Sequence, residues 1–81
     1  MNIQIVKGNF SSKDILEIIT GLIHVKIRYH EQKISTSQNE EDVKMREKKI
    51  KQLQESLQQA REQLQHLQQN VSADCTLSLA I

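Results

Sequence analysis

A seven-residue repeat of apolar side chains in the second half of the chain constrains the fold more than any other feature. It consists of Val43, Ile50, Leu57, Leu64 and Val71, with Leu53, Ala60 and Leu67 repeating the same spacing three residues later. This spacing is typical of a helix that packs along one seam against another helix, and Arg46 and Asp74 interrupt it at its ends. We therefore expect a helix over about residues 40–70. Its seam against the neighbouring helix would consist of Val43, Ile50, Leu53, Leu57, Ala60, Leu64 and Leu67.

An earlier helix is predicted over about residues 12–35, because Ser11 and Asp14 have the spacing of an N-terminal capping pair and apolar side chains follow at helical intervals. Projected at 100° per residue, these side chains cover an arc of about 200°. They are Ile15, Leu16, Ile18, Ile19, Leu22, Ile23, Val25 and Ile27. A helix with one neighbour needs an arc of only about 100°. We therefore expect a second subunit beside the hairpin partner, and we predict these side chains as the oligomer interface.

Residues 36–39 are predicted to form the turn between the two helices. The segment from Ser35 to Asn39 holds only small or polar side chains, which favour turns and caps. Asn39 is a suitable N-cap, and the acidic residues 40–42 follow it, where the helix dipole favours negative charge. Two long helices joined by so short a turn form an antiparallel hairpin.

The two ends of the chain are predicted to be extended. Residues 2–6 alternate polar and β-branched side chains, which suits a strand, and Lys7 to Asn9 indicate a turn after it. In the tail 71–81, residues 75–81 alternate apolar and polar side chains, which indicates a second strand; a frayed terminus is the alternative. A hairpin brings both ends to one side, so these strands would pair, within one chain or between two. The whole chain is predicted to be one mainly α domain.

The length of the chain indicates an oligomer. A domain of 81 residues buries only about 60% of the surface that its unfolded chain exposes, and the single Cys75 cannot form an intrachain disulfide. A two-helix hairpin has one helix–helix interface and cannot enclose a core. We therefore expect a homodimeric four-helix bundle with a two-fold axis, with a tetramer as the alternative.

No set of residues in the chain matches a catalytic or cofactor-binding pattern. Gly8 and Gly21 are the only glycines, which excludes a glycine-rich phosphate loop. The spacing of His24, His30 and His66 does not provide a zinc site within one chain. We therefore predict a protein that is not an enzyme and has no metal or other cofactor.

Charge and hydropathy indicate a cytoplasmic protein with no membrane segment. The formal net charge is +1, which gives no overall field toward DNA or a membrane. The most apolar stretch, residues 15–27, is too short to span a bilayer and is interrupted by charged side chains. The function that these features favour is a non-catalytic oligomeric scaffold or protein-interaction module, with a partner protein that the sequence does not identify.

A basic cluster at the start of the second helix supports an alternative, a small nucleic-acid-binding regulator. Its members are Lys44, Arg46, Lys48, Lys49 and Lys51. Basic helices bind phosphate backbones. Acidic residues one helical turn before these bases would pair with them, and the cluster would then be an ordinary solvent-exposed face of the helix. The expected ion pairs are Glu40–Lys44, Asp42–Arg46 and Glu47–Lys51.

A second polar group, Lys26, His30 and Lys33, lies inside the arc that is apolar earlier in the first helix. Together with Tyr29 it would form a basic contact surface at the turn end of the bundle. The interpretation that we favour is that the oligomer core ends near Ile27 and the lysine stems cover its rim.

Overall fold

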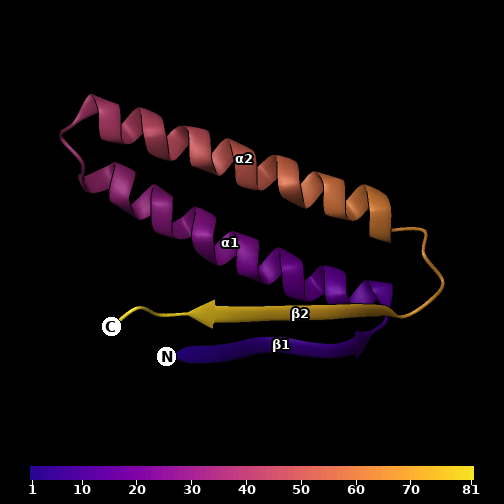
Figure 1. Cartoon of the computed structure of the whole chain (residues 1–81). Helices are drawn as coiled ribbons and strands as arrows, with labels where there is room; N and C mark the ends of the chain where they lie inside the picture. Colours follow the sequence, from indigo (N-terminus) through magenta and orange to yellow (C-terminus); the bar gives the residue numbers. More distant parts are fainter.

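Two long helices and a two-stranded sheet make up the computed structural model, which describes residues 1–81 (Figure 1). In chain order the elements are β1 (Asn2–Phe10), α1 (Ser12–Thr36), α2 (Glu40–Leu64) and β2 (Val71–Ser78). Each helix has 25 residues, so the protein is mainly helical, as predicted. The helices form the expected hairpin, and β1 pairs antiparallel with β2. Neither helix has the length and apolarity needed to span a membrane.

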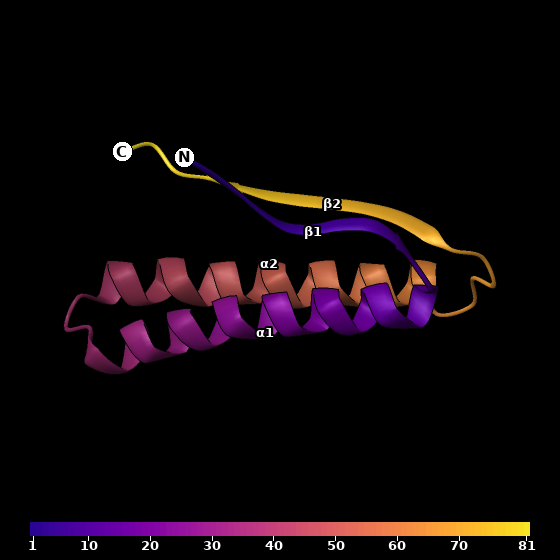
Figure 2. The ribbon, with the colours of Figure 1, turned by 90° about the horizontal axis from the view of Figure 1, so that it is seen from below.

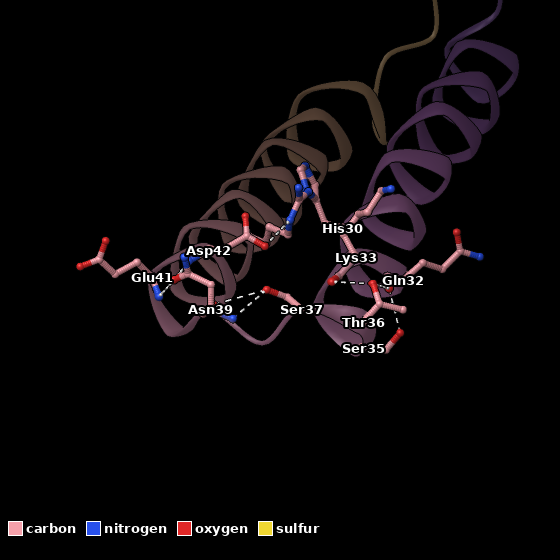
Figure 3. Close-up of polar contacts among 10 residues, drawn as sticks. His30, Gln32, Lys33, Ser35, Thr36, Ser37, Asn39, Glu41 and Asp42 are labelled. Atoms are coloured by element: carbon pink, nitrogen blue, oxygen red, sulfur yellow. Dashed lines mark hydrogen bonds and ion pairs between the residues drawn. The ribbon is translucent and has the colours of Figure 1, made fainter.

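The helix starts follow the capping residues that the sequence predicts. The Ser11 hydroxyl accepts a hydrogen bond of 3.1 Å from the Asp14 backbone N–H at the start of α1. At the start of α2, the Asn39 side-chain oxygen accepts hydrogen bonds of 2.9 and 3.3 Å from the backbone N–H groups of Glu41 and Asp42 (Figure 3). These bonds satisfy N–H groups that have no partner inside the helix, and each cap contributes about 1 kcal/mol.

The two helices meet along a seam with the spacing of a coiled coil. On α2 this helix seam is formed by Val43, Arg46, Ile50, Leu53, Leu57, Ala60 and Leu64. On α1 the matching row is Leu16, Thr20, Ile23, Ile27, His30 and Ile34. All of these residues are partly or fully buried, and spacings of three and four residues alternate along both rows. The helix seam therefore contains one ionisable side chain from each helix, His30 and Arg46.

The sheet has one apolar and one polar face, because residues that pair across antiparallel strands point to the same side. The apolar face is formed by the pairs Ile3–Leu77, Val6–Cys75, Gly8–Ala73 and Phe10–Val71. The polar face is formed by Asn2–Ser78, Gln4–Thr76, Lys7–Asp74 and Asn9–Ser72. A bulge between Gln4 and Val6 leaves Ile5 without a partner and keeps Ile3 on the same face as Val6.

β1 extends to Phe10, so the prediction of a strand that ends at residue 6 before a turn is wrong. Lys7, Gly8 and Asn9 pair with β2 and belong to the strand. Gly8 has a φ of 141°, a backbone conformation that favours glycine. A glycine at this position therefore allows the strand to continue with an irregular backbone. A partner strand from the far end of the chain determines this outcome, and local turn preference carries no information about it.

The second half of the chain differs from its prediction in where helix gives way to strand. α2 ends at Leu64 instead of near residue 70, and β2 spans Val71–Ser78 instead of about 75–81. Val71, the last member of the seven-residue repeat, pairs with Phe10 in the sheet. Leu67, predicted in the helix seam, lies in the connecting loop, where its carbonyl accepts a 2.8 Å hydrogen bond from the Ser12 hydroxyl. The chain leaves the helix here because pairing with β1 requires it to turn back along α1.

The sheet forms a second layer over one side of the hairpin, with its apolar face toward the helices (Figure 2). The two layers are closest at the start of α1 and separate toward the free ends of the chain. An apolar groove lies between them, lined by Val6, Ile15, Ile18, Leu22, Val71 and Cys75 among others. Of these residues only Ile15 is buried, so the packing between the layers is incomplete.

Candidate interaction surface

A second row of apolar side chains runs along α1, apart from the helix seam. This outer row consists of Ile15, Ile18, Leu22, Val25 and Tyr29, again with alternating spacings of three and four residues. Its first three members line the groove against the sheet. Leu22 is nevertheless 43% exposed, and Val25 and Tyr29, outside the groove, are 66% and 49% exposed. The second part of this regular apolar row is therefore exposed over much of its surface.

The sheet leaves a matching set of apolar side chains uncovered. At its free end, Ile3, Ile5, Leu77 and Leu79 are all exposed. Ile3 and Leu77 belong to the face that the sheet turns toward the helices, but the sheet has separated from α1 at this point (Figure 2). The outer row of α1 and the free end of the sheet thus both carry exposed apolar side chains.

The structure divides the predicted oligomer interface between three environments. Leu16, Ile23 and Ile27 are in the helix seam toward α2, and Ile15, Ile18 and Ile19 line the groove under the sheet. Leu22 and Val25 are the two that remain exposed. The wide apolar arc thus packs against two neighbours inside the chain, because the sheet covers a part of α1 that was predicted to contact a second subunit. The rest of the arc, Leu22 and Val25, still faces outward.

A polar cluster is built into the helix seam near the turn. His30 is 5% exposed, and its Nδ1 lies 3.1 Å from Arg46 Nη1. Because a guanidinium only donates hydrogen bonds, Nδ1 is the acceptor and the ring proton is on Nε2. Arg46 Nε donates to Asp42 Oδ2 at 3.2 Å, which is the one salt bridge of the structure. The Tyr29 ring lies 5.3 Å from the His30 ring and 5.7 Å from the Arg46 guanidinium carbon.

The surroundings of His30 favour its neutral form. Burial lowers the pKa of His30, and the nearby cations Arg46, Lys49 and Lys26 lower it further, while Asp42 opposes them. Its Nε2 is buried and has no hydrogen-bond partner in the chain. The pKa of the Asp42 carboxyl is also lowered, chiefly by the polar Ser37 side chain and then by Arg46.

The burial of His30 was not predicted from the sequence. We interpreted this residue, together with Lys26 and Lys33, as the rim of a core that ends near Ile27. Instead the helix seam continues through His30 to Ile34, and the two lysines are exposed. The signal was present in the sequence, because His30 lies seven residues after Ile23 and continues its row along the helix.

The five basic residues of the proposed nucleic-acid contact do not form one surface. Lys44, Lys48 and Lys51 lie on the face of α2 opposite the helix seam, since they are exposed and one turn apart. Lys49 lines a shallow depression with Lys26 of α1. Arg46 turns inward to His30. Of the expected ion pairs only Asp42–Arg46 forms, so the four lysines have no carboxylate partner within the chain.

The structure brings no further set of reactive side chains together. No group of three or more His, Cys, Asp or Glu residues lies close enough to hold a metal ion. Cys75 is a free, exposed thiol on the sheet. Comparison of the chain with protein-family models, with curated proteins and with solved structures found no match.

Proposed function

We propose that this protein is a non-catalytic scaffold or protein-interaction module that works as a homo-oligomer, with the hairpins of two copies forming a four-helix bundle. The main support for this proposal is the solvent-exposed area of the chain. The chain exposes 6532 Å², whereas a compact monomer of its 9.4 kDa mass exposes about 5,000 Å². The surplus of about 1,500 Å² per chain is surface that a folded monomer of this size normally buries.

The burial of individual residues supports the same proposal. Only Ile15, Leu57 and His30 are buried among 81 residues, and no large side chain is completely enclosed. Burying one large apolar side chain contributes about 1.5–3 kcal/mol, and a typical domain is stable by only 5–15 kcal/mol in total. A chain with so few buried side chains is marginally stable alone and gains much of its free energy of unfolding from the apolar surface of another subunit.

The oligomeric state tests the proposal directly. Light scattering coupled to size-exclusion chromatography should give at least twice the chain mass of 9.4 kDa. The sample should keep this mass on dilution through the micromolar range, and circular dichroism should show helix at each concentration. A folded, helical species of 9.4 kDa at every concentration would contradict the proposal.

Nucleic-acid binding is a second candidate, favoured by the lysines on the outer face of α2 that lack a carboxylate partner. Lys44, Lys48 and Lys51 repeat at one-turn intervals, and a two-fold oligomer would present them twice. Titration of a labelled DNA duplex at low salt tests this candidate. Replacing Lys48 and Lys51 by Glu should abolish the binding while the oligomer remains intact. If the wild-type protein does not shift the duplex at low salt, this candidate is excluded.

A further inference from the structure

We infer that the outer row of α1 is the contact between two copies of this chain, with the two α1 helices crossing antiparallel so that Val25 of each copy packs over Gly21 of the other. The inference rests on the proposed homo-oligomer and specifies its interface. Such a pairing is self-complementary, as a two-fold axis requires, because Gly21 contacts Val25 and Val25 contacts Gly21.

The periodicity of the outer row indicates that its occupant is a helix. Spacings of three and four residues continue from Ile15 to Tyr29, although the sheet covers only the first part of the row. A strand would match a period of two, whereas this period matches a second helix packed along the row. Within the chain, α1 is the only helix with an unfilled apolar row, since Met45 is the only large exposed apolar residue of α2. The helix that fits this row is therefore α1 of another copy.

Gly21 is the second observation that indicates a helix contact. It lies mid-helix, three residues after Ile18 and four before Val25, at the edge of the outer row. A glycine inside a helix costs about 1 kcal/mol relative to alanine. Nothing lies within 4 Å of the place where a Cβ would be, so the chain itself gives no reason for this residue. That reason is a partner helix, which approaches the backbone closely at Gly21 and places its Val25 side chain in the open space beside the glycine.

The available area agrees with a dimer of this kind. A surplus of about 1,500 Å² per chain corresponds to about 3,000 Å² for a pair, within the 2,000–5,000 Å² that obligate dimers bury. The free end of the sheet would contribute to this area, because Ile3 and Leu77 are exposed on the sheet face that is turned toward the helices and would cover the partner's α1. A second copy would add to α1 both a helix and the exposed end of a sheet.

Sedimentation of the full chain and three variants tests the interface. Val25→Glu should abolish the dimer, because it places a charge at the crossing. Met45→Glu is the matched control, an equally drastic change at an exposed apolar residue of α2, and should remain dimeric. Gly21→Ala should raise the dimer dissociation constant by about tenfold or more, although it favours helix in the single chain. Circular dichroism at low concentration should show helix in all three variants, since Val25 and Met45 are exposed and Gly21 has open space beside it.

The outcomes separate the interface from the oligomer itself. A monomeric wild-type chain would overturn both the proposed function and this inference. A dimeric wild type whose dissociation constant is unchanged by Val25→Glu and by Gly21→Ala would overturn the inference alone.

Cross-linking gives a readout that does not depend on the stability of the variants. In a Cys75→Ser background, Val25→Cys should be captured as a dimer by a short bismaleimide, and Lys48→Cys on the outer face of α2 should not. Capture at Lys48→Cys but not at Val25→Cys would place the second copy on α2 and overturn the inference.

Discussion

His30 and Arg46 face each other in the helix seam, and each satisfies a requirement of the other. The guanidinium supplies a donor to a buried ring nitrogen, and Asp42 compensates the charge of the guanidinium at 3.2 Å. The other positions of the helix seam are mostly Ile and Leu and would tolerate a shift of the helices past each other. A single polar layer among apolar layers penalises such a shift, because both groups would then be buried unpaired. We therefore interpret this pair as the feature that fixes the alignment of α1 on α2.

Replacing one or both members of the pair tests this interpretation. Arg46→Leu should lower the free energy of unfolding by about 1–3 kcal/mol, since it leaves the His30 Nδ1 buried without a donor. The double variant His30→Leu/Arg46→Leu should recover most of this loss, because two apolar residues need no partner. Denaturant unfolding of Arg46→Leu, of His30→Leu and of the double variant gives the coupling energy between the two residues. Simply additive effects would show that the pair does not act as a unit.

Stability should depend on pH through His30. The folded chain lowers the pKa of His30, by burial and by the nearby cations, so protons bind the unfolded chain more readily. The free energy of unfolding should be highest above about pH 6.5, the ordinary pKa of histidine, and should fall as the pH decreases from there toward the lowered pKa.

Denaturant unfolding between about pH 8 and pH 5 measures this dependence, and below that range the carboxyl groups begin to protonate. His30→Asn should remove the dependence. His66→Asn, a change at an exposed residue beyond the end of α2, should retain it and serves as the control. An equal loss of pH dependence in both variants would exclude His30 as its source.

At the level of elements, the sequence predicts the helices and their starts because these depend on nearby residues. The caps at Ser11 and Asn39 and the seven-residue repeat are local patterns, and α1 matches its predicted range to within one residue. The strands are different, because β1 and β2 are extended through pairing across the whole chain. That pairing extends β1 over Lys7 to Asn9 and ends α2 at Leu64, against the local preference in both places. Four members of the outer row were predicted as part of one broad face, and Tyr29 was predicted with the basic group near the turn. Only the position of the sheet separates the outer row from the helix seam.

Gly8→Ala tests how much the sheet depends on its irregular residue. The φ of Gly8 is 141°, where an alanine is strained, while the added Cβ would only touch the Phe10 ring at 3.9 Å. The substitution should therefore destabilise the sheet by about 1–3 kcal/mol through the backbone and not through a clash. Hydrogen exchange should become faster at the amides of β1 and β2. The amides in the middle of α1 and α2 should keep their protection, and equal loss in the helices would show that the two layers unfold together.

In the whole molecule, the sheet and the hairpin are two amphipathic layers that are held together along only part of their length. The sheet has a polar face toward solvent and an apolar face toward α1, and α1 has one apolar row toward α2 and one toward the sheet. The layers close at the end where the strands join the helices and open toward the chain ends (Figure 2). Much of the apolar surface that remains uncovered is therefore on α1 and on the sheet end that faces it, which is the arrangement that a symmetric pair of chains would complete.

The thermal stability of such a pair should depend on protein concentration, because unfolding releases two chains. For a dimer that unfolds as it dissociates, a tenfold increase in protein concentration raises the free energy of unfolding by about 1.5 kcal/mol near the melting temperature. With an unfolding entropy of about 2.1 cal/mol/K per residue over two chains of 81 residues, Tm should rise by about 4 °C per tenfold increase in concentration.

Calorimetry over two decades of concentration measures this slope, and the Val25→Glu variant provides the comparison. In that variant the melting temperature should be lower and independent of concentration, since a monomer melts as a single chain. A wild-type Tm that does not change with concentration would mean that each chain is stable alone. In that case association of two chains through the outer row would not stabilise the folded state.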